Sequence, residues 1–195
     1  MTITDFDTAP TAAIDDLTGD YSIDVAHTRI GFTARHAMVT SVRGSFQDFE
    51  GSAHLDATDP TKSSAKLAIK VASITTGQEQ RDAHLRSPDF FDVETYPEIT
   101  FVSTSAEQLD DDTYRLSGDL TVKDVTRPVS IDFTFNGTAK DPYGNLRAGF
   151  EGQASLNRKE WGLTWNTALE TGGFLVSDKV KLEFDVSAVK LTPTS

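Results

Sequence analysis

Four histidines, His27, His36, His54 and His84, are the residues best suited to metal or acid–base chemistry, because imidazole titrates near neutral pH and binds metals. No pair has the short spacing by which a strand or helix brings two ligands to one ion. We therefore expect no metal site. The chain contains no cysteine, which excludes disulfides and cysteine nucleophiles and fits a reducing compartment.

Motifs for nucleophilic catalysis and for phosphate binding are missing. The sequence has no G-x-S-x-G elbow, no G-x-x-x-x-G-K-[ST] loop and no G-x-G-x-x-G loop. Serine, histidine and aspartate are plentiful, but their abundance alone does not indicate a catalytic triad. We name no catalytic residue and expect that the protein is not an enzyme.

One histidine falls among apolar residues. If a strand runs without a bulge from Ile30 to His36, then Ile30, Phe32, Ala34 and His36 share one face. A buried imidazole needs a hydrogen-bond partner, or it faces a cavity that holds a ligand or water. Both arrangements fit the pattern, and a bulge would reverse the face.

A second polar group lies in residues 75–97, where polar and apolar residues do not alternate. Gln78–Leu85 is predicted to form a short helix, on which Arg81 and His84 share a side. Arg81, Asp82 and His84 could bind an oxygen-rich head group, or Arg81 and Asp82 could pair with neighbours and pin this segment. A long loop in a compact β domain is usually functional or covers something.

Elsewhere the pattern has a period of two, which is typical of strands with one buried and one exposed face. Val129, Ile131, Phe133 and Phe135, for example, alternate with polar residues. This favours antiparallel pairing, because buried parallel strands are continuously apolar. Eight strands are predicted, at 20–36, 43–56, 64–74, 98–106, 112–122, 126–137, 146–158 and 178–190. Such a series forms a barrel or a sandwich.

The inward positions of these strands mix large and small residues. Five phenylalanines have the inward parity: Phe32, Phe101, Phe133, Phe150 and Phe184. Small residues at the same parity, namely Ala34, Gly118, Gly152 and Ala154, are expected to leave room between them. An eight-stranded barrel is just wide enough to be filled by side chains or to hold one ligand. The connection Trp165–Ser177, with Gly172–Gly173, is predicted to be a flap.

Composition limits the partners. The net charge is −12 and the isoelectric point about 4.6, and no run of Lys or Arg offers a basic patch, so we expect no nucleic acid partner. No apolar run is long enough to span a bilayer. MTITDFDTAP at the start lacks bases and an apolar core, so it does not resemble a secretory signal, and we expect a cytoplasmic protein. Residues 1–20 are predicted to be a flexible acidic tail, and 21–190 one domain.

Four blocks of sequence resemble the YceI-like family of lipocalin-like polyisoprenoid-binding proteins. The opening is similar in His27–Phe32, Arg35–His36 and Val42–Phe46. The most distinctive block is Gln80–Pro97, with Arg-Asp-Ala-His-Leu, Phe-Phe and Tyr-Pro, and Leu116–Pro128 and Asn157–Leu163 are also similar. Asp124 stands where glycine is expected, and Trp161 where phenylalanine is common. The resemblance covers about 21–190.

The resemblance implies an all-β fold, an eight-stranded antiparallel lipocalin-like barrel with a short helix or loop insertion around 76–97. It implies a tunnel that holds a polyisoprenoid, prenyl quinone or similar lipid, no other cofactor, and a possible homodimer. We expect the polar end of the ligand near Arg81, Asp82 and His84. The full set of expected ligand contacts is Phe32, His36, Arg81, Asp82, His84, Leu85, Phe90, Phe91, Phe101, Phe133, Phe150 and Trp165.

Two other functions remain open at this point. An enzyme acting on an isoprenoid or acyl lipid could use His36 or His84 as its acid or base, which requires that histidine to reach a second catalytic group inside the cavity. A barrel filled by side chains would instead be a structural or interaction module.

Overall fold

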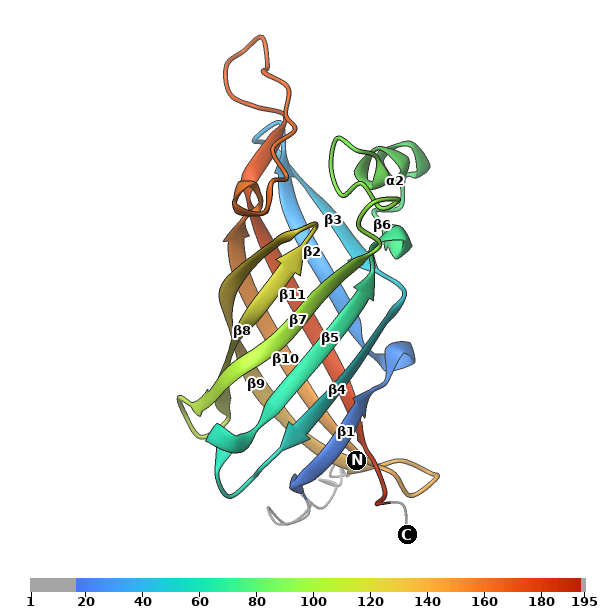
Figure 1. Ribbon diagram of the computed structural model, residues 1–195, viewed down its shortest axis with the longest axis vertical. Helices are drawn as coiled ribbons and strands as arrows, with labels where there is room; N and C mark the ends of the chain where they lie inside the picture. Colours follow the sequence, from blue (N-terminus) through green and yellow to red (C-terminus); the bar gives the residue numbers. More distant parts are fainter. Residues whose placement is uncertain (1–16, 194–195) are drawn as a thin grey trace, which may run out of the picture.

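The computed structural model describes residues 17–193, and in it one antiparallel sheet curls into an elongated barrel (Figure 1). Its strand segments are β1 Gly19–Ile23, β2 Arg29–His36, β3 Thr40–Phe46, β4 Phe49–Leu55, β5 Ser64–Lys70, β6 Ile74–Thr75, β7 Glu98–Gln108, β8 Thr113–Val122, β9 Val125–Lys140, β10 Leu146–Asn157 and β11 Val176–Lys190. The α-helix α2 spans Glu79–Arg86. Short 3-10 helices lie at η1 Val25–His27, η2 Pro60–Lys62, η3 Val71–Ser73 and η4 Arg158–Trp161.

These eleven segments occupy eight positions around the barrel. β1 and β2 both pair with β11, β3 and β4 lie at the next position, and β5 and β6 follow. From β7 onward each strand pairs with its neighbour in the chain, and β11 returns to β1 and β2. The barrel is therefore closed, and the predicted eight-stranded antiparallel barrel with one short helix is confirmed.

The first predicted strand, 20–36, is interrupted by η1. Val25 has the same parity as Tyr21 and Ile23, yet its side chain is 41% exposed. The cause is local, because the Asp24 carboxylate accepts a hydrogen bond from the backbone N–H of Ala26, at 3.1 Å, and caps a turn. The expectation of one continuous strand was wrong here, although β2 continues at the same barrel position.

The second and third predicted strands break together at one crossing point. Between β3 and β4, the backbone N–H groups of Gln47 and Asp48 both donate to the Ser73 hydroxyl, at 3.1 and 3.0 Å. Ser73 belongs to η3, which separates β5 from β6. The hydroxyl of a single serine thus accepts from both backbone N–H groups at the bend between β3 and β4.

The irregular segment after β6 forms α2, one residue later than predicted. The Gln78 side chain caps this helix by accepting from the N–H of Arg81. Figure 1 shows α2 beside the upper end of the barrel, together with the β2–β3 turn and the connection from η4 to β11. The lower end carries the β4–β5, β7–β8 and β9–β10 loops and the start of β1.

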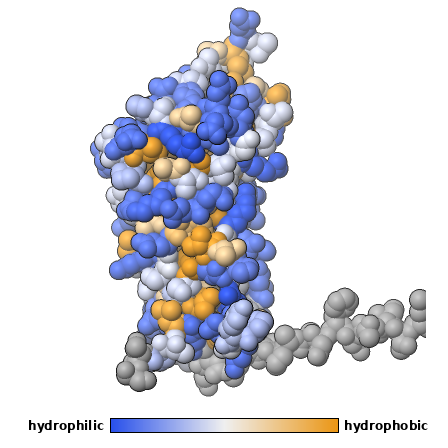
Figure 2. All heavy atoms as spheres, turned by 90° about the vertical axis from the view of Figure 1, so that its right-hand side faces the viewer, coloured by the Kyte–Doolittle hydropathy of each residue, from blue (hydrophilic) through white to orange (hydrophobic). Residues whose placement is uncertain are grey.

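Alternation sorts the side chains as the sequence predicted. Buried aliphatic and aromatic residues from most of the strands point inward, and Figure 2 shows a mostly hydrophilic exterior with scattered apolar patches. A smaller cluster of Tyr21, Ala148 and Ala188 fills the lower end, where β1 meets β10 and β11. Most of the predicted tail, 1–16, lies outside the described residues, and β1 begins at Gly19.

Candidate ligand-binding cavity

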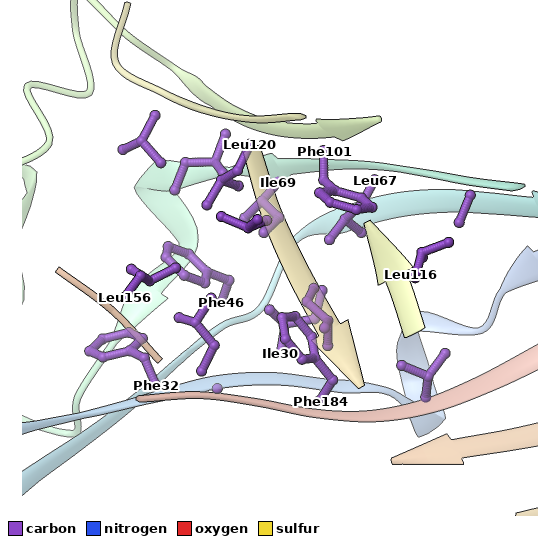
Figure 3. Close-up of a pocket in the computed structure, with 18 of the residues that line it drawn as sticks. Ile30, Phe32, Phe46, Leu67, Ile69, Phe101, Leu116, Leu120, Leu156 and Phe184 are labelled. Atoms are coloured by element: carbon purple, nitrogen blue, oxygen red, sulfur yellow. The ribbon is translucent and has the colours of Figure 1, made fainter. Parts of the chain in front are cut away.

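The barrel interior holds a cavity of about 330 Å³. Its walls come from strands all around the barrel and from the segment that contains α2, and they are made almost wholly of carbon. Figure 3 shows ten of the lining side chains pointing into shared space: Ile30, Phe32, Phe46, Leu67, Ile69, Phe101, Leu116, Leu120, Leu156 and Phe184. A volume of this size falls within the range of small-molecule sites, which begins at about 300 Å³.

The inward glycines shape this cavity in an unexpected way. A Cβ built on Gly152 would lie 2.5 Å from the ring of Phe133, its partner on β9. One built on Gly118 would lie 2.4 Å from the Val102 carbonyl oxygen and 2.6 Å from Phe101 Cζ. We expect these glycines to leave open space, but neither lines the cavity, because the Phe133 ring covers Gly152, and the Phe101 ring and the β7 backbone cover Gly118. The rings therefore lie against the wall instead of crossing the lumen.

One charged side chain lies deep in the lining. Arg158 is 4% exposed, and its Nε and Nη1 donate to the carbonyls of Ser177 and Leu163, at 3.0 and 2.5 Å. Within residues 17–193, its Nη2 has no hydrogen-bond partner, and the Asp178 carboxylate lies 3.8 Å away. Burial lowers the pKa of Arg158 from its usual value, but a guanidinium stays protonated in proteins.

Seven of the twelve predicted contact residues line the cavity. They are Phe32, Leu85, Phe90, Phe91, Phe101, Phe133 and Phe150. They come from four strands and from the α2 segment, so the structure brings together residues that are far apart in the sequence. Whether each one contacts a ligand stays a prediction.

The other five predicted residues do not line the cavity. His36 has the inward parity of Phe32 and Ala34, but β2 ends there, so its side chain is exposed at the rim. Asp82 is buried and accepts from both the N–H and the hydroxyl of Thr76. Arg81 donates from Nε to the Thr76 hydroxyl, at 2.7 Å, and from Nη2 to the Thr76 carbonyl, at 3.0 Å. This pair pins the loop before α2.

His84 and Trp165 form a cap over one end of the cavity. The His84 ring packs edge-on against Phe90 and Trp165, with centroids 5.1 and 4.6 Å apart, and Phe90 and Trp165 lie 5.2 Å apart. His84 Nε2 also lies 2.8 Å from an oxygen of Asp89, which orients the imidazole. Only Phe90 of these rings lines the cavity, so the cap supports the wall from outside.

Sequence reasoning did not select several lining residues. Leu67, Leu116 and Leu182 line the cavity, and each stands in an alternating run, a signal that is enough to predict an inward side chain. Arg158 and Trp161 gave no such signal, because their burial depends on η4 folding back under the barrel rim. The indole N–H of Trp161 donates to the carbonyl of Leu120, at 3.0 Å, and fixes that position.

The described residues contain neither a cluster of metal ligands nor a membrane-spanning helix. Among residues 17–193, no group of three or more His, Asp or Glu side chains could hold a metal ion. No helix in the described part of the chain is long and apolar enough to cross a bilayer.

Comparisons with known proteins place this fold. Residues 21–188 match the YceI-like domain family. A UPF0312 protein of Pseudomonas savastanoi pv. phaseolicola is 40% identical over 149 residues, which cover 75% of this chain and 78% of that protein. The crystal structure of Burkholderia cenocepacia BcnA matches with a TM-score of 0.75 and 24% identity over 85% of this chain and 98% of that one.

A third match carries a functional description of its own. It is a polyisoprenoid binding domain from Saccharophagus degradans, described as implicated in plant cell wall breakdown. The TM-score is 0.66 with 14% identity, and the match covers 88% of this chain and 98% of that one. At this identity the likeness shows a shared fold.

Proposed function

Because this chain belongs to the YceI-like domain family, we propose that its barrel binds a long apolar lipid, such as a polyisoprenoid or prenyl quinone, for carriage, storage or sequestration. The observation that carries this proposal is the cavity of about 330 Å³ with its almost entirely apolar wall. The structurally similar polyisoprenoid binding domain of S. degradans supports it.

Apolar burial alone supplies enough affinity for such a ligand. Each buried CH₂ contributes about 0.8 kcal/mol, so three or four isoprene units contribute roughly 12 kcal/mol before costs. Association and ordering consume part of that gain, which leaves a dissociation constant in the micromolar to nanomolar range. No charged anchor is required.

The polar end of the ligand is proposed to lie at the α2 end of the cavity. Arg81 and Asp82 are engaged with Thr76, whereas the His84 side chain is 38% exposed and adjoins Phe90, which lines the cavity. Of these three residues, His84 is therefore the one that we propose to meet a ligand oxygen, at the end of the cavity that it caps.

We propose binding without catalysis. An enzyme would need His36 or His84 inside the cavity next to a second catalytic group. His36 lies at the rim, and the one side-chain hydrogen bond of His84, to Asp89, lies outside the cavity wall.

The first experiment is native mass spectrometry of the purified protein, followed by lipid extraction. A near-stoichiometric prenyl or acyl species supports the proposal and identifies the ligand class. A protein that is free of lipid and also refuses added prenyl lipids while folded contradicts it.

A matched pair of variants on β7 links the ligand to the cavity. Ala106 lines the cavity, whereas Val102 faces outward and is 45% exposed. Ala106→Trp should fill the lumen and abolish lipid binding, and Val102→Trp should leave binding unchanged. Equal binding by both variants would mean that the lipid lies elsewhere.

A further inference from the structure

Three exposed apolar side chains lie together at the upper end of the barrel, and we call them the tip. They are Met38, Val39 and Phe174, with 57%, 74% and 54% of their surface exposed. Met38 and Val39 belong to the β2–β3 turn, and Phe174 to the connection before β11. The backbone joins these two segments, because the N–H of Ala37 donates to the carbonyl of Leu175, at 2.7 Å.

The turn that carries Met38 is strained. Ala37 and Met38 have φ values of 48° and 63°, and the N–H of Val39 donates to the His36 carbonyl, at 3.1 Å. Two successive residues at positive φ are normally Asn and Gly, because other side chains clash there. Folding alone does not explain alanine and methionine at these positions, and strain of this kind gathers at functional sites.

The charge near the tip differs from that of the whole molecule. Residues 34–41 and 158–179 contain four basic side chains (Arg35, Arg158, Lys159, Lys179) and three acidic ones (Glu160, Glu170, Asp178). The chain as a whole carries a net charge of −12. These two segments therefore meet less repulsion at an anionic lipid surface than the acidic rest of the barrel, which includes the α2 segment beside the same end. The Lys159 ammonium lies 5.9 Å from the centre of the Phe174 ring, close enough to contact head groups once the ring is inserted.

The shape and position of the tip favour a fluid partner. Figure 1 shows the connection before β11 projecting beyond the barrel, and Figure 2 shows apolar surface just below its outermost polar residues. The same strands lead directly to the cavity, since Ala34 of β2 and Val176 of β11 line it. A convex apolar projection suits insertion into a bilayer, as interfacial anchors do.

We propose that the tip is a contact site for the surface of a lipid bilayer, from which the barrel takes up its ligand or to which it returns it. The second half of this statement rests on the proposed function, because an apolar ligand of the cavity resides in membranes. The contact itself does not, and it can be measured without ligand.

The test is flotation of the full chain with ligand-free phosphatidylcholine vesicles. Met38→Asp and Phe174→Ser should each lower the vesicle-bound fraction by about tenfold, because each replaces an apolar side chain that would insert into the bilayer with a polar one. The control is Tyr143→Ser, which removes an 89% exposed aromatic residue from the β9–β10 loop at the opposite end (Figure 1). Tyr143→Ser should bind as the unmodified protein does.

A further variant separates the tip from folding. Ala37→Asn combined with Met38→Gly supplies the residues that this turn prefers, so it should raise Tm while lowering vesicle binding. A higher Tm with undiminished vesicle binding would overturn the proposal. So would an unmodified protein that does not float, or tip variants that float as well as it does.

Ligand delivered from detergent distinguishes this proposal from the proposed function. Tip variants should bind that ligand normally but take it up more slowly from vesicles. Loss of vesicle contact with normal detergent-delivered binding leaves the cavity function standing and confirms the tip. Vesicle contact without any ligand binding refutes the cavity function alone.

If tip variants instead convert a dimer into monomers in lipid-free buffer, the tip is an interface between copies and the membrane proposal is wrong.

Discussion

The far end of the Phe32 ring lies against Gly44, its direct partner across the β2–β3 pair. A Cβ at Gly44 would overlap the far edge of that ring, so no other residue leaves the ring where it is. Phe133 and Gly152 repeat the relationship between β9 and β10. Covering a strand glycine with a cross-strand aromatic stabilises the sheet, and here it also keeps the lumen open.

Gly152→Ala should therefore narrow the cavity. The added Cβ displaces the Phe133 ring toward the lumen, which lowers the free energy of unfolding by about 1–3 kcal/mol. The loss in the free energy of lipid binding should be larger than this loss in stability. Urea unfolding and lipid titration measure the two effects. Gly149→Ala is the control on the same strand, because its Cβ would meet only Asn136, at an ordinary 3.7 Å. Equal lipid affinity in both variants would show that ring placement does not set the cavity.

The sequence predicts which side chains face inward but not how far along the barrel they lie. Alternation correctly identified Leu67, Leu116 and Leu182 as inward, because parity is a local property of a strand. It also assigned His36 to the inner face, yet depth depends on where β2 ends, and His36 lies at the rim. Parity alone therefore overestimates the number of residues that reach a ligand.

Cross-strand relationships lie beyond a single sequence. That Phe133 covers Gly152 follows from the β9–β10 register, which shifts at a bulge between Gly149 and Phe150. The burial of Arg158 likewise depends on η4 and β11 meeting in space. At Val25 a local contact has the larger effect, because the Asp24 cap turns the chain and exposes a side chain that alternation assigns to the inner face.

Trp165→Ala should speed release of the ligand. Trp165 supports Phe90 and His84 from outside the cavity wall, with centroids 5.2 and 4.6 Å away. Aromatic pairs contribute about 0.5–1.5 kcal/mol each, so the dissociation rate is expected to rise about threefold to tenfold. Stopped-flow displacement of a fluorescent lipid measures it. Trp165→Phe keeps an aromatic ring beside Phe90 and His84 and should release ligand at nearly the original rate. Release from Trp165→Phe as fast as from Trp165→Ala would contradict the role given to ring packing.

Arg158→Lys should lower stability. Lysine cannot reproduce the fork that reaches the carbonyls of Ser177 and Leu163, and a hydrogen bond to a charged group contributes about 1.5–3 kcal/mol. Urea unfolding of both proteins gives the difference. Lys159→Met, at the neighbouring exposed position, loses a surface ion pair with Asp178 and a contact with the exposed Phe174 ring, and should change stability by less than about 1 kcal/mol. A larger loss at Lys159 than at Arg158 would contradict the structural role given to the buried fork.

The β9–β10 loop should make the barrel sensitive to acid. The side chain of Asn145 donates to the Asp141 carboxylate, Arg147 adds a second bond, and together they lower the pKa of Asp141 to about 2. Arg147 also donates to Asp24 and lowers its pKa. An aspartate in the unfolded chain has a pKa of about 3.9, so the stabilisation from ionised Asp141 is present above that pH and is lost as the pH falls toward 2.

Thermal unfolding between pH 7 and 2 tests this linkage. Asp141→Asn cannot titrate, so its Tm should fall less steeply below pH 4 than that of the unmodified protein, although it starts from a lower value at neutral pH. Asp111→Asn, which removes one charge from the β7–β8 turn, is the control and should keep the original slope. Identical slopes for Asp141→Asn and the unmodified protein would mean that acid acts on other carboxylates, of which Asp24, on the far side of Arg147, is the next to replace.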